Sequence, residues 1–528
     1  MAPRLVISGW DAATFSVIDP MLEQGRLPAL GALIERGFRA TLRSTWPPMT
    51  DCAWTSAFTG CNAGKHGIFG SWYRAPGAYA CRYFSSRDRA VPALWDLAPD
   101  VRFVVWNVPM TFPPTPVEGV MVAGYGAPPR AGFCAPASFE KELTSRWPVE
   151  DLLDRAPHGS LESFLDDLLR GLEAQSDALV WAARQAAVDC VVAVWPQIDR
   201  AQHFLWRYRG RTGPLSDGVE RVYEAVDRAT SQLCDAFPEA DHIVVSDHGA
   251  GPLSGDVNLG AWLGRRGLAH HKRGRRGLLE LAWRLPPTVR KRAKALWPGL
   301  ARRAVAGTLA GQLGPFDWDR TEAFVGFHGD LWINLQGREP RGVVPRQAAS
   351  DLIEEIATEV VALEDPGSGA PLFAGAHRRA EIYGGPLAAR GPDLMLDSWS
   401  AGYRIAPSRG PESDLVSEPE SLAGVRQAWS ADHRPEGVFV AAGPRISRGS
   451  IDELSLLDVC PTALVLLEQA VPEGLDGRVA KTSLDPGFLE RSPVRSTGPA
   501  GVRIAEGTYS DEEAAAVAAH LRDLGYIE

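Results

Sequence analysis

The sequence predicts an α/β protein whose core is a doubly wound, mostly parallel β-sheet with helices on both faces. Short apolar runs rich in Val, Ile and Phe lack polar alternation, as expected of strands that are covered on both faces. Between these runs, apolar residues recur at helical spacing, so strands and helices alternate along the chain. With 528 residues, 45% of them hydrophobic, the chain is long enough to bury a large core.

The predicted strands and the clearest helices can be placed in chain order. The apolar runs that indicate buried parallel strands are Arg4–Trp10, Val101–Pro109, Cys190–Trp195, His242–Val245 and Gly437–Ala442. One helical stripe is made by Leu27, Leu30, Leu33 and Ile34 and ends near Gly37, and another covers Val459–Gln469.

Two stretches interrupt this alternation, and we expect both to be cap-like insertions on a core that spans residues 1–486. The first, at about 111–175, is rich in Pro and Gly and then acidic, and the second lies at about 256–320. Between Arg265 and Arg303 there are thirteen Lys or Arg and one acid, so this segment carries +12 while the remainder carries −22. It is interpreted as a solvated cap helix, a lid that attracts an anionic substrate, or a surface for membrane or nucleic acid.

The end of the chain and the overall composition restrict the class of protein further. Residues 487–508 are predicted to be a linker, followed by a last helix that opens at Ser510 with Glu513 completing a capping box. The net charge of −10 argues against nucleic acid as the main partner, and no apolar run reaches the roughly 18 residues of a membrane span. Seven cysteines without CxxC spacing, and no predicted signal peptide, indicate reduced thiols in a cytoplasmic protein.

Aspartate and histidine residues follow or precede the predicted strands at regular places. Because the carboxyl ends of parallel strands face one crevice, we expect the side chains near these ends to converge, with one further histidine reaching them from a loop. Several carboxylates forced together repel one another, and a divalent cation relieves that repulsion. Mixed carboxylate and imidazole ligands suit Zn²⁺, with Mn²⁺ as the alternative. The residues concerned are Asp11, Asp199, His203, Asp247, His248 and, from the loop, His433.

Thr50 is a second candidate for chemistry. Pro47 and Pro48 favour an extended approach, and the pattern from Asp51 onward is helical, which places Thr50 at or beside a helix N-cap. Free backbone N–H groups and the helix dipole favour an anion at such a place. A hydroxyl there, beside a metal, is suited to act as a nucleophile.

Several longer motifs resemble those of the alkaline phosphatase superfamily, in its type I phosphodiesterase/nucleotide pyrophosphatase branch. The chain is most similar to the bacterial group described as predicted phosphohydrolases or phosphomutases, and the motifs occur in the family's order over most of the chain. They are GWDAATF at 9–15, GRLPALGALIERG at 25–37, STWPPMTDCAWTSAFTGCNAGKHGIFG at 44–70, QIDRAQHFLW at 197–206, SDHGAG at 246–251, INLQGREP at 333–340, WSADHRPEGVF at 429–439 and LLDVCPTALVLLEQAVPEGLDGR at 456–478.

The resemblance implies an alkaline-phosphatase-like fold, two divalent metal ions and a nucleophilic threonine at Thr50. It implies in-line attack by Thr50 on phosphorus and a phosphothreonine intermediate that water then hydrolyses. The implied ligands of the first ion are Asp11, Thr50, Asp247 and His248, and those of the second are Asp199, His203 and His433.

Two departures from the family's patterns bear on the substrate. Cys52 is followed by Ala53, Trp54 and Thr55, so the CxPxR context of sulfatases is absent, which argues against a sulfatase. Nucleotide pyrophosphatases often place an Asn a few residues after HGI, whereas this chain continues with Phe69, Gly70 and Ser71. This difference puts a preference for nucleotide diesters in doubt, and Lys65, Ser71 and His328 are the candidate substrate contacts.

We therefore expect a metal-dependent hydrolase that cleaves a small-molecule phosphodiester or phosphomonoester through Thr50. Two alternatives stay open at this point. A phosphomutase or phosphotransferase uses the same intermediate with an alcohol in place of water, and a binding protein retains the metals without catalysis. The sequence decides neither the substrate nor the oligomeric state.

Overall fold

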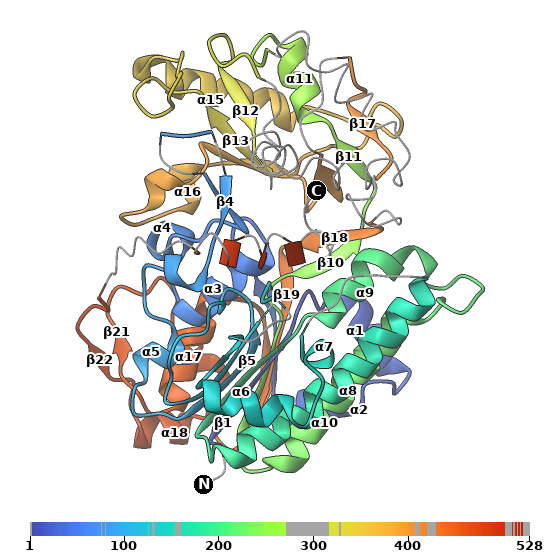
Figure 1. The fold of residues 1–528 in the computed structure, drawn as a ribbon, viewed down its shortest axis with the longest axis vertical. Helices are drawn as coiled ribbons and strands as arrows, with labels where there is room; N and C mark the ends of the chain where they lie inside the picture. The colour runs from blue at the N-terminus through green and yellow to red at the C-terminus, as the bar shows by residue number, and fades with distance from the viewer. Residues whose placement is uncertain are drawn as a thin grey trace, which may run out of the picture.

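The computed structural model contains one large sheet with helices on both faces and a smaller subdomain above one edge of that sheet (Figure 1). The residues that it describes are 3–74, 77–79, 81–124, 126–128, 132–153, 160–270, 316–326, 329–406, 412–419, 429–501, 509, 513–514, 516–517 and 519–520. The predicted α/β fold class is confirmed. Among the described helices, none combines the length and apolar character that a membrane span requires.

The large sheet has nine strands in the order β20-β2-β19-β9-β1-β8-β5-β6-β7. All neighbours pair in parallel except β19, which is antiparallel to both β2 and β9, and β7, which is antiparallel to β6. The strands are β1 (Leu5–Trp10), β2 (Phe38–Arg43), β5 (Phe103–Val108), β6 (Gly119–Ala123), β7 (Cys134–Ala135), β8 (Cys190–Trp195), β9 (Asp241–Val245), β19 (Glu436–Ala442) and β20 (Gly449–Ser455).

Alternate residues of the buried strands face two separate hydrophobic layers. Val6 and Trp10 of β1 belong to the layer covered by α1, α2, α8 and α10, whereas Leu5 and Ile7 belong to the layer covered by α3, α5 and α17. The prediction that helices cover both faces of the sheet is thus confirmed. The bounds are α1 (Phe15–Glu23), α2 (Pro28–Arg36), α3 (Thr50–Thr59), α4 (Ala63–His66), α5 (Leu94–Leu97), α6 (Ala137–Thr144), α7 (Val149–Leu152), α8 (Leu161–Gln185), α9 (Gln197–Leu205), α10 (Gly218–Ala236), α17 (Val459–Leu466) and α18 (Pro486–Arg491).

Two sequence-based expectations about the sheet differ from the structure. The run at Gly437–Ala442 is a strand, but it is antiparallel rather than parallel to its neighbours. Residues 111–175, expected as a cap-like insertion, instead supply β6 and β7 at one end of the large sheet and the first part of α8, which packs on its face. The Pro- and Gly-rich composition of this stretch reflects its connecting loops, which hid the short strands between them.

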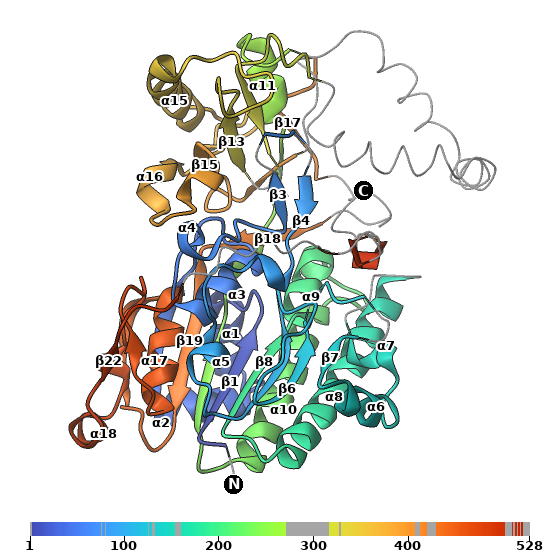
Figure 2. The same ribbon diagram turned by 60° about the vertical axis from the view of Figure 1, so that its left-hand side comes forward.

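The smaller subdomain stands above the edge of the large sheet where β1, β8 and β9 end (Figure 2). Its four-stranded antiparallel sheet has the order β12-β13-β15-β14 and a hydrophobic core of its own. We call residues 316–406 the cap; only the start of this region falls within the insertion expected at 256–320. Its elements are β12 (Ala323–Val325), β13 (Asp330–Ile333), β14 (Gly375–Arg378), β15 (Leu394–Asp397), α15 (Arg346–Val361) and α16 (Arg379–Ile382).

Shorter elements connect the cap to the large sheet or lie beside it. A three-stranded sheet has the order β16-β11-β17, and β10 pairs with β18 below the cap. These elements are β10 (Gly249–Pro252), β11 (Gly255–Val257), α11 (Leu259–Arg265), β16 (Tyr403–Ile405), β17 (Val416–Ser417) and β18 (Ala431–Arg434). A further pair joins β21 (Val471–Pro472) to β22 (Ser496–Thr497), and β22 lies within the predicted linker of residues 487–508.

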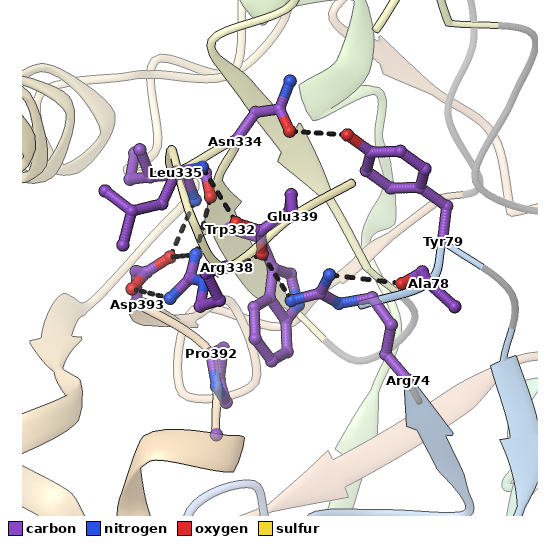
Figure 3. A network of polar contacts seen from close by, with 12 residues as sticks. Arg74, Ala78, Tyr79, Trp332, Asn334, Leu335, Arg338, Glu339, Pro392 and Asp393 are labelled. Atoms are coloured by element: carbon purple, nitrogen blue, oxygen red, sulfur yellow. Dashed lines mark hydrogen bonds and ion pairs between the residues drawn. The ribbon is translucent and has the colours of Figure 1, made fainter. Parts of the chain in front are cut away.

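The paired strands β3 (Trp72–Arg74) and β4 (Cys81–Tyr83) reach from the segment that follows α4 toward the cap (Figure 2). The guanidinium of Arg74 pairs with Glu339 at 2.7 Å, and Glu339 also pairs with Arg338 at 2.8 Å. Arg338 continues to Asp393 at 2.6 Å, as Figure 3 shows. We call this set, with Arg379 bound to Asp393, the cap network.

Most of the basic segment and most of the predicted last helix cannot be compared with the expectations. Residues 271–315 and Ser510 lie outside the described residues. The pairs 513–514, 516–517 and 519–520 are helical, and Glu513 pairs with Arg87 at 3.0 Å. All seven cysteines are in described parts of the chain, and each is a free thiol.

Candidate metal centre

Asp11 and Asp247 meet because they follow neighbouring strands. Asp11 comes directly after β1 and Asp247 two residues after β9, and these strands are paired in parallel. Both side chains are completely buried. The indole Nε1 of Trp54 donates to Asp11 Oδ2 at 2.9 Å, and the backbone N–H of Ala12 donates to Asp247 Oδ1 at 3.2 Å. The second oxygen of each carboxylate is left facing the centre.

Trp54 reaches Asp11 because β1 has a glycine beneath the indole. A Cβ atom on Gly9 would lie 2.5 Å from the Trp54 ring, closer than carbon atoms approach. The glycine therefore lets α3 lie close to β1. This packing connects the helix that begins at Thr50 to the strand that presents Asp11.

Thr50 is the first residue of α3, and Met49 is its N-cap. The Thr50 hydroxyl lies 3.3 Å from Nε2 of His248. Nε2 of His248 lies 3.2 Å from Asp247 and 3.9 Å from Asp11, and these three side chains are close enough to hold one ion. Unlike them, Thr50 is only partly buried, so part of the residue is open to solvent.

The second group lies on α9 and β18. Asp199 and His203 share one face of α9, as their spacing predicts, with His203 Nε2 3.0 Å from Asp199 Oδ1. His433 Nε2 lies 3.6 Å from the same oxygen and 3.3 Å from Nε2 of His203. Because β19 is antiparallel to β9, the segment that leads into it comes from the edge of the sheet where β1 and β9 end, and this explains how His433 reaches the centre.

The two groups of candidate ligands are adjacent. The structure also adds one carboxylate that the sequence analysis did not name as a candidate ligand. The rings of His248 and His433 stack with their centroids 3.9 Å apart, and Asp199, His248 and His433 could also share one ion. Asp432 joins His203 and His433 in a third possible ligand group. Its position directly before His433 is the signal that points to it, but it also accepts the His433 backbone N–H at 2.8 Å.

Backbone carbonyl groups fix the tautomer of all three histidines. Nδ1 of His203, His248 and His433 donates to the carbonyl groups of Ala431, Gly249 and Pro48 at 2.9, 3.0 and 2.9 Å. In the neutral rings, Nε2 is therefore the nitrogen with the free lone pair, and it points into the centre in each case. This orientation through the outer nitrogen is typical of histidine metal ligands.

The charges of the first group oppose one another in the absence of a cation. Burial, and then the charge of Asp247, raises the pKa of Asp11 well above its usual value. Burial also raises the pKa of Asp247 well above the usual value and lowers that of His248 well below it. Asp11 Oδ1 and Asp247 Oδ2 are buried and accept no hydrogen bond from any described residue. These orphaned oxygens fit a bound divalent cation.

In the second group, a protonated histidine balances the negative charge of the neighbouring carboxylate. Burial lowers the pKa of His433, but its hydrogen bond to Asp199 and the charges of Asp432, Asp199 and Asp247 outweigh burial and raise the pKa to about 9. Burial raises the pKa of Asp199, yet the neighbouring His203 and His433 hold it well below the usual value. Two Nε2 atoms 3.3 Å apart with lone pairs facing each other need a proton or a metal ion between them.

The three candidate substrate contacts are placed differently. Lys65 donates to Asp476 at 2.5 Å and to the carbonyl of Gly474 at 2.7 Å, so its charge is already paired. Ser71 hydrogen-bonds the side chain of Asp51, a buried carboxylate beside Thr50 whose pKa burial raises to about 6. His328 lies outside the described residues.

Comparison with known protein families and structures gives consistent findings. The sequence model of one family, described as type I phosphodiesterase / nucleotide pyrophosphatase, matches residues 5–412. A search of curated proteins found no match. A solved structure of inactive murine ectonucleotide pyrophosphatase / phosphodiesterase 5 in complex with AMP is 11% identical, with a TM-score of 0.52 over 92% of this chain and 100% of that chain.

A second similar structure is that of phosphonoacetate hydrolase from Sinorhizobium meliloti 1021 in complex with phosphonoacetate. It is 15% identical, with a TM-score of 0.52 over 87% of this chain and 94% of that chain. At these identities the two likenesses establish the fold.

Proposed function

Because the chain belongs to the type I phosphodiesterase / nucleotide pyrophosphatase family, we propose that it hydrolyses a small phosphodiester or phosphomonoester with Thr50 as its nucleophile. The observation that supports this proposal most is the position of the Thr50 hydroxyl. It lies 3.3 Å from His248, whose ring joins the Asp11 and Asp247 carboxylates in one potential ligand group. A hydroxyl among buried carboxylates and imidazoles, yet open to a substrate, is suited to attack phosphorus.

Two divalent ions complete the proposed site. Asp11, Thr50, Asp247 and His248 would hold one, and Asp199, His203 and His433 would hold the other, with Zn²⁺ favoured by the mixed ligands and Mn²⁺ as the alternative. When bound, such ions stabilise negative charge on attacking and leaving oxygens. The orphaned Asp11 and Asp247 oxygens are the feature of this chain that favours them.

The residues of the chain then act in a defined order. The position of Thr50 at the start of α3 directs its hydroxyl toward the edge of the sheet and places the helix N-terminus beside the substrate's negative charge. The Thr50 oxygen forms a bond to phosphorus, its proton is released, and the bond from phosphorus to the ester oxygen breaks, so the alcohol leaves. Water then cleaves the phosphothreonine, and the Thr50 hydroxyl is restored.

The decisive experiment replaces Thr50 and leaves the ligands intact. We expect Thr50→Ala to lower kcat for aryl phosphate diesters or monoesters by at least about 10³-fold, because the nucleophile is lost. Thr59→Ala, at the other end of α3, is the matched control, since the Thr59 hydroxyl donates to the Thr55 carbonyl and accepts the Cys61 backbone N–H, both away from the candidate metal centre. Metal content should be measured for both variants, and turnover by metal-loaded Thr50→Ala at the wild-type rate would contradict the proposal.

The phosphothreonine can be sought directly by mass spectrometry after rapid acid quenching. With a monoester substrate, a mass increase of one phosphoryl group is expected on the peptide that contains Thr50, and with a diester the increase also includes the ester substituent that stays on phosphorus. Adding a competing alcohol then distinguishes hydrolysis from transfer: inorganic phosphate or a monoester as the main product supports hydrolysis, and a phosphorylated alcohol supports a phosphotransferase.

A further inference from the structure

A tight backbone turn presents Asp11 to the candidate metal centre. The Trp10 carbonyl accepts the Ala13 N–H at 3.0 Å, so Asp11 and Ala12 form the centre of a four-residue turn at the end of β1. Ala12 has a φ of 60°, a left-handed conformation that is unfavourable for a residue with a Cβ atom. Such a conformation persists only where the surrounding structure holds it, and Ala12 is completely buried.

Side chains from two distant segments hold the peptide groups on either side of Ala12. The Ala12 N–H donates to Asp247 Oδ1 at 3.2 Å, and the Ala12 carbonyl accepts Nε2 of Gln202 at 2.9 Å. Gln202 lies on α9, directly before His203 and three residues after Asp199. The turn is therefore bound on one side to a ligand of the first proposed ion and on the other side to the helix that carries ligands of the second.

Gln202 is itself held in one orientation. Its side chain is buried, and Oε1 accepts the Tyr223 hydroxyl at 3.2 Å. The same hydroxyl accepts the Thr14 N–H at 3.1 Å, so its own hydrogen is available for the amide oxygen. Because a backbone carbonyl can only accept, Nε2 of Gln202 must face Ala12. The amide thus connects α10, through Tyr223, with the turn.

From these contacts we infer that Gln202 is a positioning residue: it holds the turn of residues 10–13 in the conformation that orients Asp11 and Asp247 toward their ion. It thereby links the first ion to the helix that carries ligands of the second. Gln202 acts through the Ala12 peptide groups and not as a ligand, because both of its amide atoms are already used. This inference rests on the two-ion site of the proposed function.

The test measures zinc binding to metal-free protein by competition with a chromophoric chelator. The variants Asp11→Asn and Asp199→Asn assign the two dissociation constants to the first and the second ion. Gln202→Met keeps the volume of the side chain and removes the amide. We expect it to weaken binding of the first ion about tenfold and binding of the second less than about threefold, since contacts behind metal ligands contribute at least this much to affinity.

Gln197→Met is the matched control on the same helix. Gln197 is also buried, but its amide donates to Gln175 on α8 at 3.0 Å and not to the turn. It should change neither dissociation constant by more than about threefold. If Gln202→Met weakens both ions equally, or neither, Gln202 only stabilises the helix and the inference is wrong.

A rescue variant separates the two roles further. Glycine adopts a φ of 60° without the steric penalty of alanine, so the turn needs less support in Ala12→Gly. The double variant Gln202→Met/Ala12→Gly should therefore regain part of the affinity for the first ion that Gln202→Met loses. Damage to α9 could not be repaired in this way, and a folded double variant without recovery contradicts the role.

If Gln202→Met does not fold, Tyr223→Phe takes its place in the same assay. It leaves the Gln202 amide without its hydroxyl partner, and we expect the same selective weakening of the first ion. Unchanged dissociation constants for a folded Tyr223→Phe variant would overturn the inference.

The failure of this inference differs from the failure of the proposed function. Wild-type protein that binds fewer than two zinc ions, or binds two and turns over no phosphate ester, overturns the proposed function. Wild-type protein that binds two ions and hydrolyses an ester, with Gln202→Met indistinguishable from it in both dissociation constants, overturns only the role of Gln202.

Discussion

The candidate metal centre and the cap network are both buried clusters of charge, yet they are built in opposite ways. In the cap network every carboxylate oxygen has a partner: Glu339 accepts Arg74, Arg338 and the Leu335 N–H, and Asp393 accepts two arginines and the Ile333 N–H (Figure 3). In the metal centre, one oxygen of Asp11 and one of Asp247 accept nothing from the described residues. Buried charge that is paired within the chain holds the architecture together, whereas buried charge without a partner requires a ligand.

Removing metal ions from the proposed site should have the largest effect on stability and activity. A ligand that binds only the folded state stabilises it by about 4 kcal/mol when present at a thousand times its dissociation constant, and the proposed site holds two. We therefore expect chelation to lower the denaturant midpoint strongly and to abolish activity together. Unfolding followed by circular dichroism, with metal content measured in parallel, checks this. An unchanged midpoint in protein that has lost its metal would show that the carboxylates are tolerated without a cation.

Breaking the cap network should destabilise the protein regardless of metal. Asp393→Ala leaves the guanidinium groups of Arg338 and Arg379 without their shared carboxylate, and a loss of about 3 kcal/mol is expected, as for other broken buried pairs. The same loss should appear with and without chelator, because the network is self-paired. Glu354→Ala, which breaks an exposed pair with Arg378, is the matched control and should cost far less. A chelator-dependent effect of Asp393→Ala would mean that the two clusters are coupled.

The sequence predicts which residues converge at the candidate metal centre much better than it predicts the cap network, for a physical reason. Asp11, Asp199 and Asp247 come close to strand ends, and the topology of a parallel sheet brings such positions together. Arg74, Glu339 and Asp393 follow no periodicity, and their pairing depends on how the paired strands β3 and β4 reach a separate subdomain. Their contacts are set by tertiary structure and leave no local pattern.

The antiparallel direction of β19 could not be predicted for a related reason. An apolar run such as Gly437–Ala442 is compatible with either direction in a sheet that is covered on both faces. The direction is decided by the connection from β18, which must pass the metal centre. The short strands β6 and β7 could not be predicted from the sequence either. They have five and two residues between Pro- and Gly-rich loops, which is too few to show a periodic pattern.

Neutralising one carboxylate of the candidate metal centre is expected to increase the stability of the metal-free protein, by less than the losses described above. In metal-free protein, Asp11→Asn should stabilise the fold by about 1–3 kcal/mol, because the amide can accept from Trp54 and donate to the orphaned Asp247 oxygen. The pKa of Asp11 is raised in the folded state, so its contribution to stability is present at low pH and is lost as pH rises. The advantage of the variant should therefore grow between mildly acidic and neutral pH.

Adding metal should reverse this order. Wild-type protein gains the binding energy of the ion, whereas Asp11→Asn has lost a charged ligand, so the two stability curves are expected to cross as metal is titrated. Denaturant unfolding at two pH values, with and without Zn²⁺, measures the effect. If the metal-free Asp11→Asn variant is less stable than wild type at neutral pH, the view that its buried carboxylates repel one another without a cation is wrong.

Replacing Lys65 should have the smallest effect on activity and stability. It tests the contrast between paired and unpaired charges most sharply, because Lys65 is a candidate substrate contact whose charge is already paired within the protein. Its ammonium group already pairs with Asp476, whose other oxygen accepts the backbone and side-chain N–H groups of Asn62. We expect Lys65→Met to change KM and kcat for phosphate esters by less than about twofold and stability by about 1 kcal/mol or less, as for other partly exposed pairs. Asp476→Asn, the matched control, should show the same small loss of stability. A tenfold rise in KM for Lys65→Met alone would instead mean that the ammonium leaves Asp476 to bind the phosphoryl group, and that a paired charge can still serve the substrate.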